Sequence, residues 1–198
     1  MPAERATRVP SADASTLLLD VPEADALLEA AGGRSPRGTA VLRPAHISLA
    51  FPWLAPGEAF ASIDRLDAAA RTSAPVPLQF DRVERFPPDR RGRTTLHLRL
   101  AKDEPVQALA LVLGLSLPVP HLSVVRLPGT DRTDELEAVL RAHLPLPAVA
   151  RTVQLRVRYG SWWRVEHVTH LGDRAGRPGT PVGPAPSPSA AAPGPRAG

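Results

Sequence analysis

One tetrapeptide pattern occurs twice in this chain, as His-Ile-Ser-Leu at His46–Leu49 and as His-Leu-Ser-Val at His121–Val124. Each copy lies in an alternating stretch, 45–51 and 120–127, that predicts a β-strand. Residues i and i+2 of a strand share one face, so histidine and serine should lie together and the apolar residues should point the other way. A single His-x-Ser often arises by chance. Two copies 75 positions apart, each in a predicted strand, constrain the fold far more.

The chain has 198 residues, and its composition predicts one folded domain over 15–171, long enough to bury a sound core. Residues 1–14 are polar, with scattered prolines and charges, and are predicted to be a flexible leader. Residues 172–198 are mostly Pro, Gly, Ala, Ser and Arg. Such a segment cannot bury enough apolar surface to offset its ordering entropy, so a disordered tail is expected there.

Several classes of protein are disfavoured by composition. The chain has no cysteine, which excludes disulfides, a thiolate nucleophile and a Cys-type zinc site. No apolar run approaches the roughly 20 residues of a membrane span, and the first 14 residues lack a signal-peptide core, so a cytoplasmic protein is expected. His, Asp and Glu show no metal-ligand spacing, and we expect no metal and no cofactor. The net charge of +4 permits an anionic substrate without demonstrating one.

Apolar periodicity and turn residues predict a mixed α+β domain. In each half, a helix, a His-x-Ser strand and another helix follow in that order. This echo suggests two pseudo-symmetric antiparallel sheets that face each other across a groove, with helices on the outside. The expected helices are 23–31, 58–72, 105–113 and 131–144 (with Thr133 as N-cap); the expected strands are 15–21, 45–51, 76–86, 94–100, 120–127, 153–157 and 163–171, with loops at 34–43 and 87–93.

Two facing sheets would bring the two histidines and two serines to one site. An imidazole titrates near neutrality, so two of them can act as general base and general acid at the same pH. The hydroxyls can donate hydrogen bonds to an anionic oxygen held between them. In-line displacement at phosphorus needs these groups, and it needs no metal.

At these residues the chain resembles the 2H phosphoesterase superfamily, specifically its bacterial 2'-5' RNA ligase-like (LigT-like) branch. That family carries two His-x-Thr/Ser motifs with apolar residues at the x positions. Neighbouring residues match as well, with Pro44-Ala45 before the first motif, Phe51-Pro52 after it and Pro120 before the second. The resemblance covers 16–171 and implies a bilobal fold with a metal-independent site in the groove. It implies hydrolysis of 2',3'-cyclic phosphates, reversible 2'-5' ligation of RNA ends, or processing of related cyclic nucleotides.

Carried over residue by residue, the resemblance makes His46 and His121 the acid/base pair, with either one as the base. Ser48 and Ser123 become donors to the phosphate oxygens; both stand where threonine is commoner in the family, and serine is less restrained because it lacks β-branching. Arg126 corresponds to a basic residue that often follows the second motif. Strict alternation puts it on the face opposite His121, so its role depends on how the strand ends or twists.

With this resemblance, the expected protein is a monomeric enzyme that hydrolyses RNA-related 2',3'-cyclic phosphates, with RNA ends or cyclic nucleotides as substrates and no membrane partner. A non-catalytic RNA- or nucleotide-binding module of the same fold, or a reversible 2'-5' RNA ligase, remains open. Incubation with a cyclic nucleotide separates turnover from binding alone.

Other candidate residues have simpler explanations. His167-Val168-Thr169 is a third His-x-Thr, but its surroundings favour an ordinary closing strand. His97 and Arg99 either line the groove or lie on a solvated hairpin face. Four aromatic residues either stack on a base or pack in the core or at its rim, and packing is the favoured interpretation: Trp53, Tyr159, Trp162 and Trp163.

Overall fold

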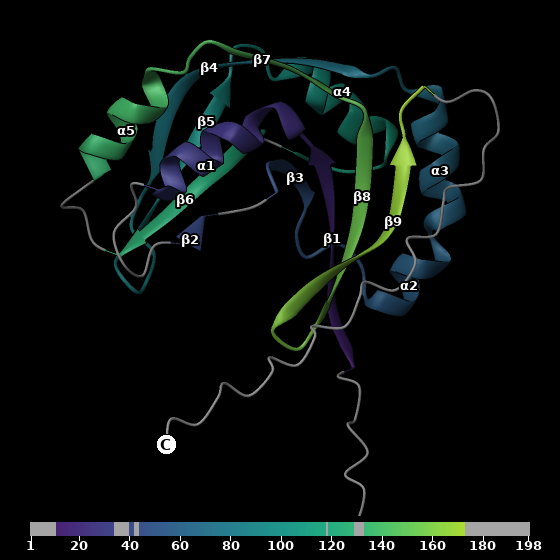
Figure 1. Ribbon diagram of the computed structural model, residues 1–198. Coiled ribbons are helices and arrows are strands. Elements are labelled where there is room, and N and C mark those ends of the chain that lie inside the picture. Colours follow the sequence, from purple (N-terminus) through teal and green to yellow (C-terminus); the bar gives the residue numbers. More distant parts are fainter. Residues whose placement is uncertain (1–10, 34–39, 42–43, 118, 129–132, 173–198) are drawn as a thin grey trace, which may run out of the picture.

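A computed structural model of the chain describes residues 11–33, 40–41, 44–117, 119–128 and 133–172 (Figure 1). Most of the expected leader and almost all of the expected tail lie outside these residues. The first strand, β1, spans Ala12–Asp20 and so includes three residues that the sequence assigned to the leader.

Within the described residues, nine strands form one continuous sheet in the order β7-β4-β5-β6-β3-β1-β8-β9, with β2 beside β6, and every pairing is antiparallel. This corrects the expectation of two separate sheets, because the two motif strands β3 and β6 pair with each other and join the halves. Figure 1 shows the sheet curving, with β4, β5 and β6 on one side of β3 and β1, β8 and β9 on the other. The remaining bounds are β2 Ala40–Val41, β3 His46–Ala50, β4 Val76–Phe86, β5 Arg93–Leu100, β6 His121–Pro128, β7 Leu146–Ala150, β8 Thr152–Tyr159 and β9 Trp162–His170.

The helices are a short 3₁₀ turn, η1 (Pro22–Ala24), followed along the chain by α1 (Asp25–Gly33), α2 (Pro56–Ala61), α3 (Ile63–Thr72), α4 (Glu104–Val112) and α5 (Thr133–Arg141). The single helix expected over 58–72 is two helices, because the backbone leaves helical geometry at Ser62. The expected N-cap bond of Thr133 is not formed among the described residues, where its buried Oγ1 has no hydrogen-bond partner.

The two faces of the sheet differ in chemistry. One face is largely apolar, and its fully buried residues include Leu19, Ile47, Leu98, Leu122 and Leu155. Helices pack against this face: α1 contributes buried leucines to the same core, α5 contacts β4, and α3 contacts β9. The opposite face carries most of the polar side chains of the central strands, and the candidate site lies there.

Candidate active site

The two His-x-Ser motifs lie side by side on the polar face. Ile47 pairs with Leu122 across β3 and β6, and both are completely buried. Because the two strands are antiparallel, the residue before Ile47 pairs with the residue after Leu122. His46 therefore lies beside Ser123, and Ser48 lies beside His121. The predicted parity of each motif is therefore confirmed: the apolar residues are buried, and the histidines and serines share the other face.

Both motif histidines are held by a backbone carbonyl two residues earlier. Nδ1 of His46 lies 2.6 Å from the Pro44 oxygen, and Nδ1 of His121 lies 3.0 Å from the Val119 oxygen. A carbonyl only accepts, so Nδ1 carries the proton in each neutral ring. Nε2 is then the atom that can take a proton from, or give one to, a reacting group. The same local geometry thus orients both imidazoles for proton transfer.

The surroundings of His46 favour its neutral form. Burial lowers the pKa of His46, and the nearby charges of Arg156 and His121 lower it further. The hydrogen bond to Pro44 and the charge of Asp25 oppose this shift without reversing it. The surroundings of His46 therefore favour the unprotonated imidazole at neutral pH.

Arg126 lies on the same face as His121, contrary to strict alternation. The cause is a β-bulge in β6: consecutive residues Leu96 and His97 of β5 pair with Val125 and Ser123, which leaves Val124 as an extra residue. Beyond the bulge, each side chain of β6 lies on the face opposite to the one that strict alternation predicts. Arg126 then lines the same cavity as His46 and Ser48, and its Nε donates to the Thr95 hydroxyl at 3.3 Å.

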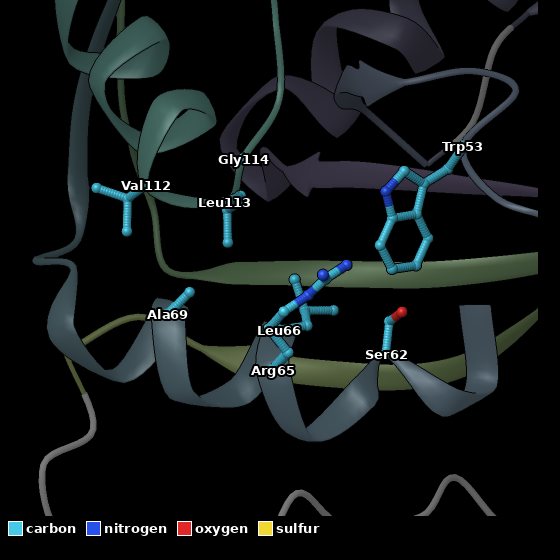
Figure 2. A pocket seen from close by; sticks show the side chains of 8 residues that line it. All are labelled: Trp53, Ser62, Arg65, Leu66, Ala69, Val112, Leu113 and Gly114. Carbon is cyan, nitrogen blue, oxygen red and sulfur yellow. The ribbon is translucent and has the colours of Figure 1, made fainter. Parts of the chain in front are cut away.

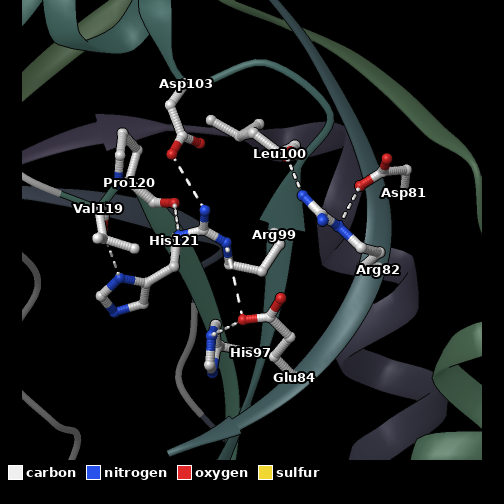
Figure 3. Close-up of polar contacts among 10 residues, drawn as sticks. All are labelled: Asp81, Arg82, Glu84, His97, Arg99, Leu100, Asp103, Val119, Pro120 and His121. Atoms are coloured by element: carbon white, nitrogen blue, oxygen red, sulfur yellow. Dashed lines mark hydrogen bonds and ion pairs between the residues drawn. The ribbon is translucent and has the colours of Figure 1, made fainter.

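A third histidine, His97, lies against His121 (Figure 3). It is 3% exposed, its ring stacks on Phe86 at 4.0 Å between centroids, and it meets His121 edge-on at 5.2 Å. Its Nε2 lies 3.6 Å from a carboxylate oxygen of Glu84, which also approaches Arg99. Burial lowers the pKa of His97 to about 4, with a smaller contribution from the His121 charge. His97 and Arg99 thus lie on the site face, and His97 is buried rather than solvated.

The motif residues of β3 open onto a cavity of about 790 Å³, a volume typical of small-molecule sites. Two exposed aromatic rings at its edge, Phe51 and Trp163, meet edge-on with centroids 5.9 Å apart. Sequence reasoning missed Gln154 and Arg156, although their i, i+2 spacing in a predicted strand was a usable signal. The lining comprises Thr16, Leu18, Pro44, His46, Ser48, Phe51, Arg126, Gln154, Arg156, Trp163 and Val165.

The other aromatic candidates lie elsewhere. Trp53 packs partly buried against the core. Tyr159 stacks on Trp162 at 5.1 Å, and its hydroxyl donates to Glu166. Packing therefore accounts for Trp53 and Tyr159, whereas Trp163 lines the cavity.

The third His-x-Thr copy is engaged on the helix side of the sheet. Nε2 of His167 lies 2.8 Å from Oδ1 of Asp67 on α3, and the Thr169 hydroxyl donates to the same oxygen at 2.5 Å. Both side chains are buried. The copy therefore anchors a helix to β9, in agreement with the expectation of an ordinary strand.

A second cavity, of about 200 Å³, lies among Trp53, α3 and the end of α4 (Figure 2), and none of the motif residues lines it. Within the described part of the chain, no group of three or more His, Cys, Asp or Glu residues is arranged to hold a metal ion. None of the described helices is long and apolar enough to cross a membrane.

A curved antiparallel sheet whose two central strands each present His-x-Ser on one face defines the 2H phosphoesterase class. A family model described as the 2'-5' RNA ligase superfamily matches residues 21–162, and the chain belongs to this superfamily. A comparison with curated protein sequences finds no match.

Solved structures share the fold. TT0787 of Thermus thermophilus is 15% identical, with a TM-score of 0.58 over 80% of this chain and 98% of that one. E. coli LigT is 16% identical, with a TM-score of 0.53 over 81% and 98% of the two chains. Usb1 of Kluyveromyces marxianus is 14% identical, with a TM-score of 0.51 over 80% and 98%.

Proposed function

We propose that this protein is a metal-independent phosphoesterase that hydrolyses RNA-related 2',3'-cyclic phosphates, with His46 and His121 as its acid/base pair. The observation that carries the proposal is the paired geometry of the two motifs. Two imidazoles, each with Nδ1 held by a carbonyl, stand on adjacent strands with a hydroxyl beside each. This arrangement offers two proton-transfer atoms and two oxygen donors to one phosphate.

In the proposed step, Nε2 of His46 takes a proton from water as the water oxygen bonds to phosphorus. The bond from phosphorus to one ribose oxygen breaks, and Nε2–H of His121 gives that oxygen a proton. The products are a ribose hydroxyl and a phosphomonoester. The lowered pKa of His46 supports its role as the base. Ser48, Ser123 and Arg126 donate to the nonbridging oxygens, whose charge grows in the transition state.

The nucleotide character of the substrate is supported by the cavity and by relatives. The cavity joins cationic side chains with exposed aromatic rings, which suits a phosphate attached to a base. E. coli LigT, which shares the fold, has been crystallised with NADP+ and with ATP. Nucleotide binding by that protein is consistent with a nucleotide or RNA end as the substrate here.

The test is hydrolysis of nucleoside 2',3'-cyclic phosphates in the presence of EDTA. We expect turnover by the native protein, and a loss of about 10²–10⁴-fold in kcat for His46→Ala or His121→Ala, because each removes one proton-transfer group. His143→Ala is the matched control, since His143 is exposed on the α5 side, where its Nδ1 bonds to Val139.

Undiminished turnover by either motif variant would contradict the proposed roles. Binding of cyclic nucleotides without turnover by the native protein would instead favour a binding module. Joining of RNA ends in the same assay would show ligation, and EDTA-sensitive turnover would contradict the metal-independent mechanism.

A further inference from the structure

Arg156 is a half-buried cation that faces the candidate site from β8. It lines the same cavity as His46 and Ser48. Its Nε and Nη2 atoms both donate to the side-chain oxygen of Gln154, at 3.1 and 2.7 Å. A guanidinium has five N–H donors, and this contact uses two of them. Donors of Arg156 therefore remain for a ligand in the cavity.

The charge of Arg156 has no carboxylate within ion-pair distance among the described residues. Burial lowers the pKa of Arg156, and Asp20 opposes this shift only through a longer-range charge. Two arginines of the same hairpin differ from Arg156: Arg158 contacts Asp13 at 2.8 Å, and Arg164 contacts Glu166 at 2.6 Å. Taking a charge out of water without a counter-charge is unfavourable, so the position of Arg156 favours an anionic ligand.

Strand register separates the backbone of Arg156 from the backbone of the motif serine Ser48. Leu18 of β1 pairs with Ser48 on one side and with Gln154 on the other. Gln154 is thus two strand spacings from Ser48, roughly 10 Å along the sheet. Arg156 pairs with Thr16, two residues along the strands from the pair formed by Leu18 and Gln154. A phosphate held between the motifs and a phosphate held by Arg156 would be two different groups of one substrate.

We propose that Arg156, oriented by Gln154, binds a second phosphate of the substrate, on the 5' side of the ribose that carries the cyclic phosphate. The inference rests on the proposed function and narrows its substrate class to nucleotides that also carry a 5'-phosphate group. That group is a monoester in a 5'-phosphorylated mononucleotide and a diester in an RNA end. Planar guanidinium groups suit both, since they bind phosphate oxygens in pairs.

The experiment compares three substrates: adenosine 2',3'-cyclic phosphate, its 5'-phosphorylated form, and a dinucleotide that ends in a 2',3'-cyclic phosphate. For the native protein we expect the 5'-phosphate to lower KM about tenfold or more, the size of one charge-assisted contact. A preference for the monoester identifies a mononucleotide substrate, and an equal or greater preference for the dinucleotide identifies an RNA end.

Variants assign the effect to Arg156. In Arg156→Gln the KM ratio between substrates with and without the 5'-phosphate should fall close to one, and in Arg156→Lys it should be intermediate. Arg164→Gln is the matched control on the neighbouring strand β9, and it should keep the native ratio because Arg164 pairs with Glu166 and does not line the cavity. Thermal midpoints of all three variants check that they are folded.

The outcomes separate this inference from the proposed function. Equal KM values for all substrates with the native protein, or an unchanged ratio in Arg156→Gln, would overturn the inference and leave the hydrolase intact. If no substrate is hydrolysed, the proposed function fails, and calorimetric binding of 5'-AMP against adenosine then tests Arg156 alone. Tighter native binding of 5'-AMP that is lost in Arg156→Gln supports the second-phosphate site; equal binding overturns it.

Discussion

At the scale of single residues, His97 shows how a side chain can belong to a site without being in a motif. It pairs in register with Glu84 of β4 on one side and with Ser123 of β6 on the other. It therefore lies directly beside a residue of the second motif. Phe86 covers one face of its ring, and His121 meets its edge. His97 and Phe86 therefore limit the movement of the His121 ring, while burial keeps His97 itself neutral.

This neutrality predicts a pH dependence of stability. The pKa of His97 is about 4 in the folded protein and about 6.5 when unfolded, so the unfolded chain binds more protons between these values. The free energy of unfolding should be highest above pH 6.5 and should fall as the pH drops toward 4. At about 1.4 kcal/mol per pKa unit, the contribution of His97 is on the order of 3 kcal/mol.

The measurement is denaturant unfolding at several pH values. His97→Gln, which stays uncharged, should lose less stability than the native protein between pH 6.5 and 4. His170→Gln, at an exposed position at the end of β9, should follow the native curve. Parallel pH profiles for native and His97→Gln proteins would show that His97 is not buried in neutral form.

At the scale of secondary-structure elements, one carboxylate of α3 accepts two buried hydrogen bonds from β9. Asp67 accepts from both His167 and Thr169, whose side chains are buried. Asp67→Ala leaves these groups without a partner, and each buried polar group left unsatisfied costs about 1–3 kcal/mol. We expect a clear drop in the free energy of unfolding but normal hydrolysis, since these bonds lie on the helix side of the sheet.

Asp64→Ala, at an exposed position in the first turn of the same helix, is the control and should cost little. A loss of kcat in Asp67→Ala at unchanged stability would mean that the third His-x-Thr copy takes part in the chemistry after all.

Sequence periodicity predicted the strands with strong alternation and failed where tertiary pairing decides. The strand at 76–86 was predicted with its observed bounds. β7 was missed because Pro147 interrupts it, yet proline is tolerated there since β7 is an edge strand beside β4. The face of Arg126 could not be predicted either, because a bulge depends on the pairing partner and leaves no mark in apolar spacing. The faces of the motif residues, by contrast, could be predicted from the alternation of side chains along a strand.

At the scale of the whole molecule, the two halves meet where β3 pairs with β6. That junction is carried by Ile47 and Leu122, both fully buried. The core residues of both halves form one contiguous cluster. One sheet with one core should unfold in a single cooperative transition.

The tryptophans provide the test, because all three lie in the half that contains β1, β8 and β9: Trp53 bonds through its amide to Ser15 of β1, and Trp162 and Trp163 begin β9. Tryptophan fluorescence reports this half, and far-UV circular dichroism reports both. We expect coincident urea transitions, and in Leu122→Ala a shared shift of about 2–5 kcal/mol from the cavity left at the junction. Separate transitions would show that the halves are independent.

The crossed placement of the motifs, with each histidine beside the serine of the other strand, gives each end of the site one imidazole and one hydroxyl. Because the two ends carry the same groups, the lowered pKa that favours His46 as the proposed base comes from its surroundings, first from burial and then from the charge of Arg156. Substrate polarity must therefore be decided by residues that have no counterpart across the strand pair, namely Arg126 beyond the bulge, Arg156 on β8, and the Phe86–His97 rings on the far side of His121. Exchanging such residues, with both motifs left intact, is the direct route to reversing which end of a substrate the site accepts.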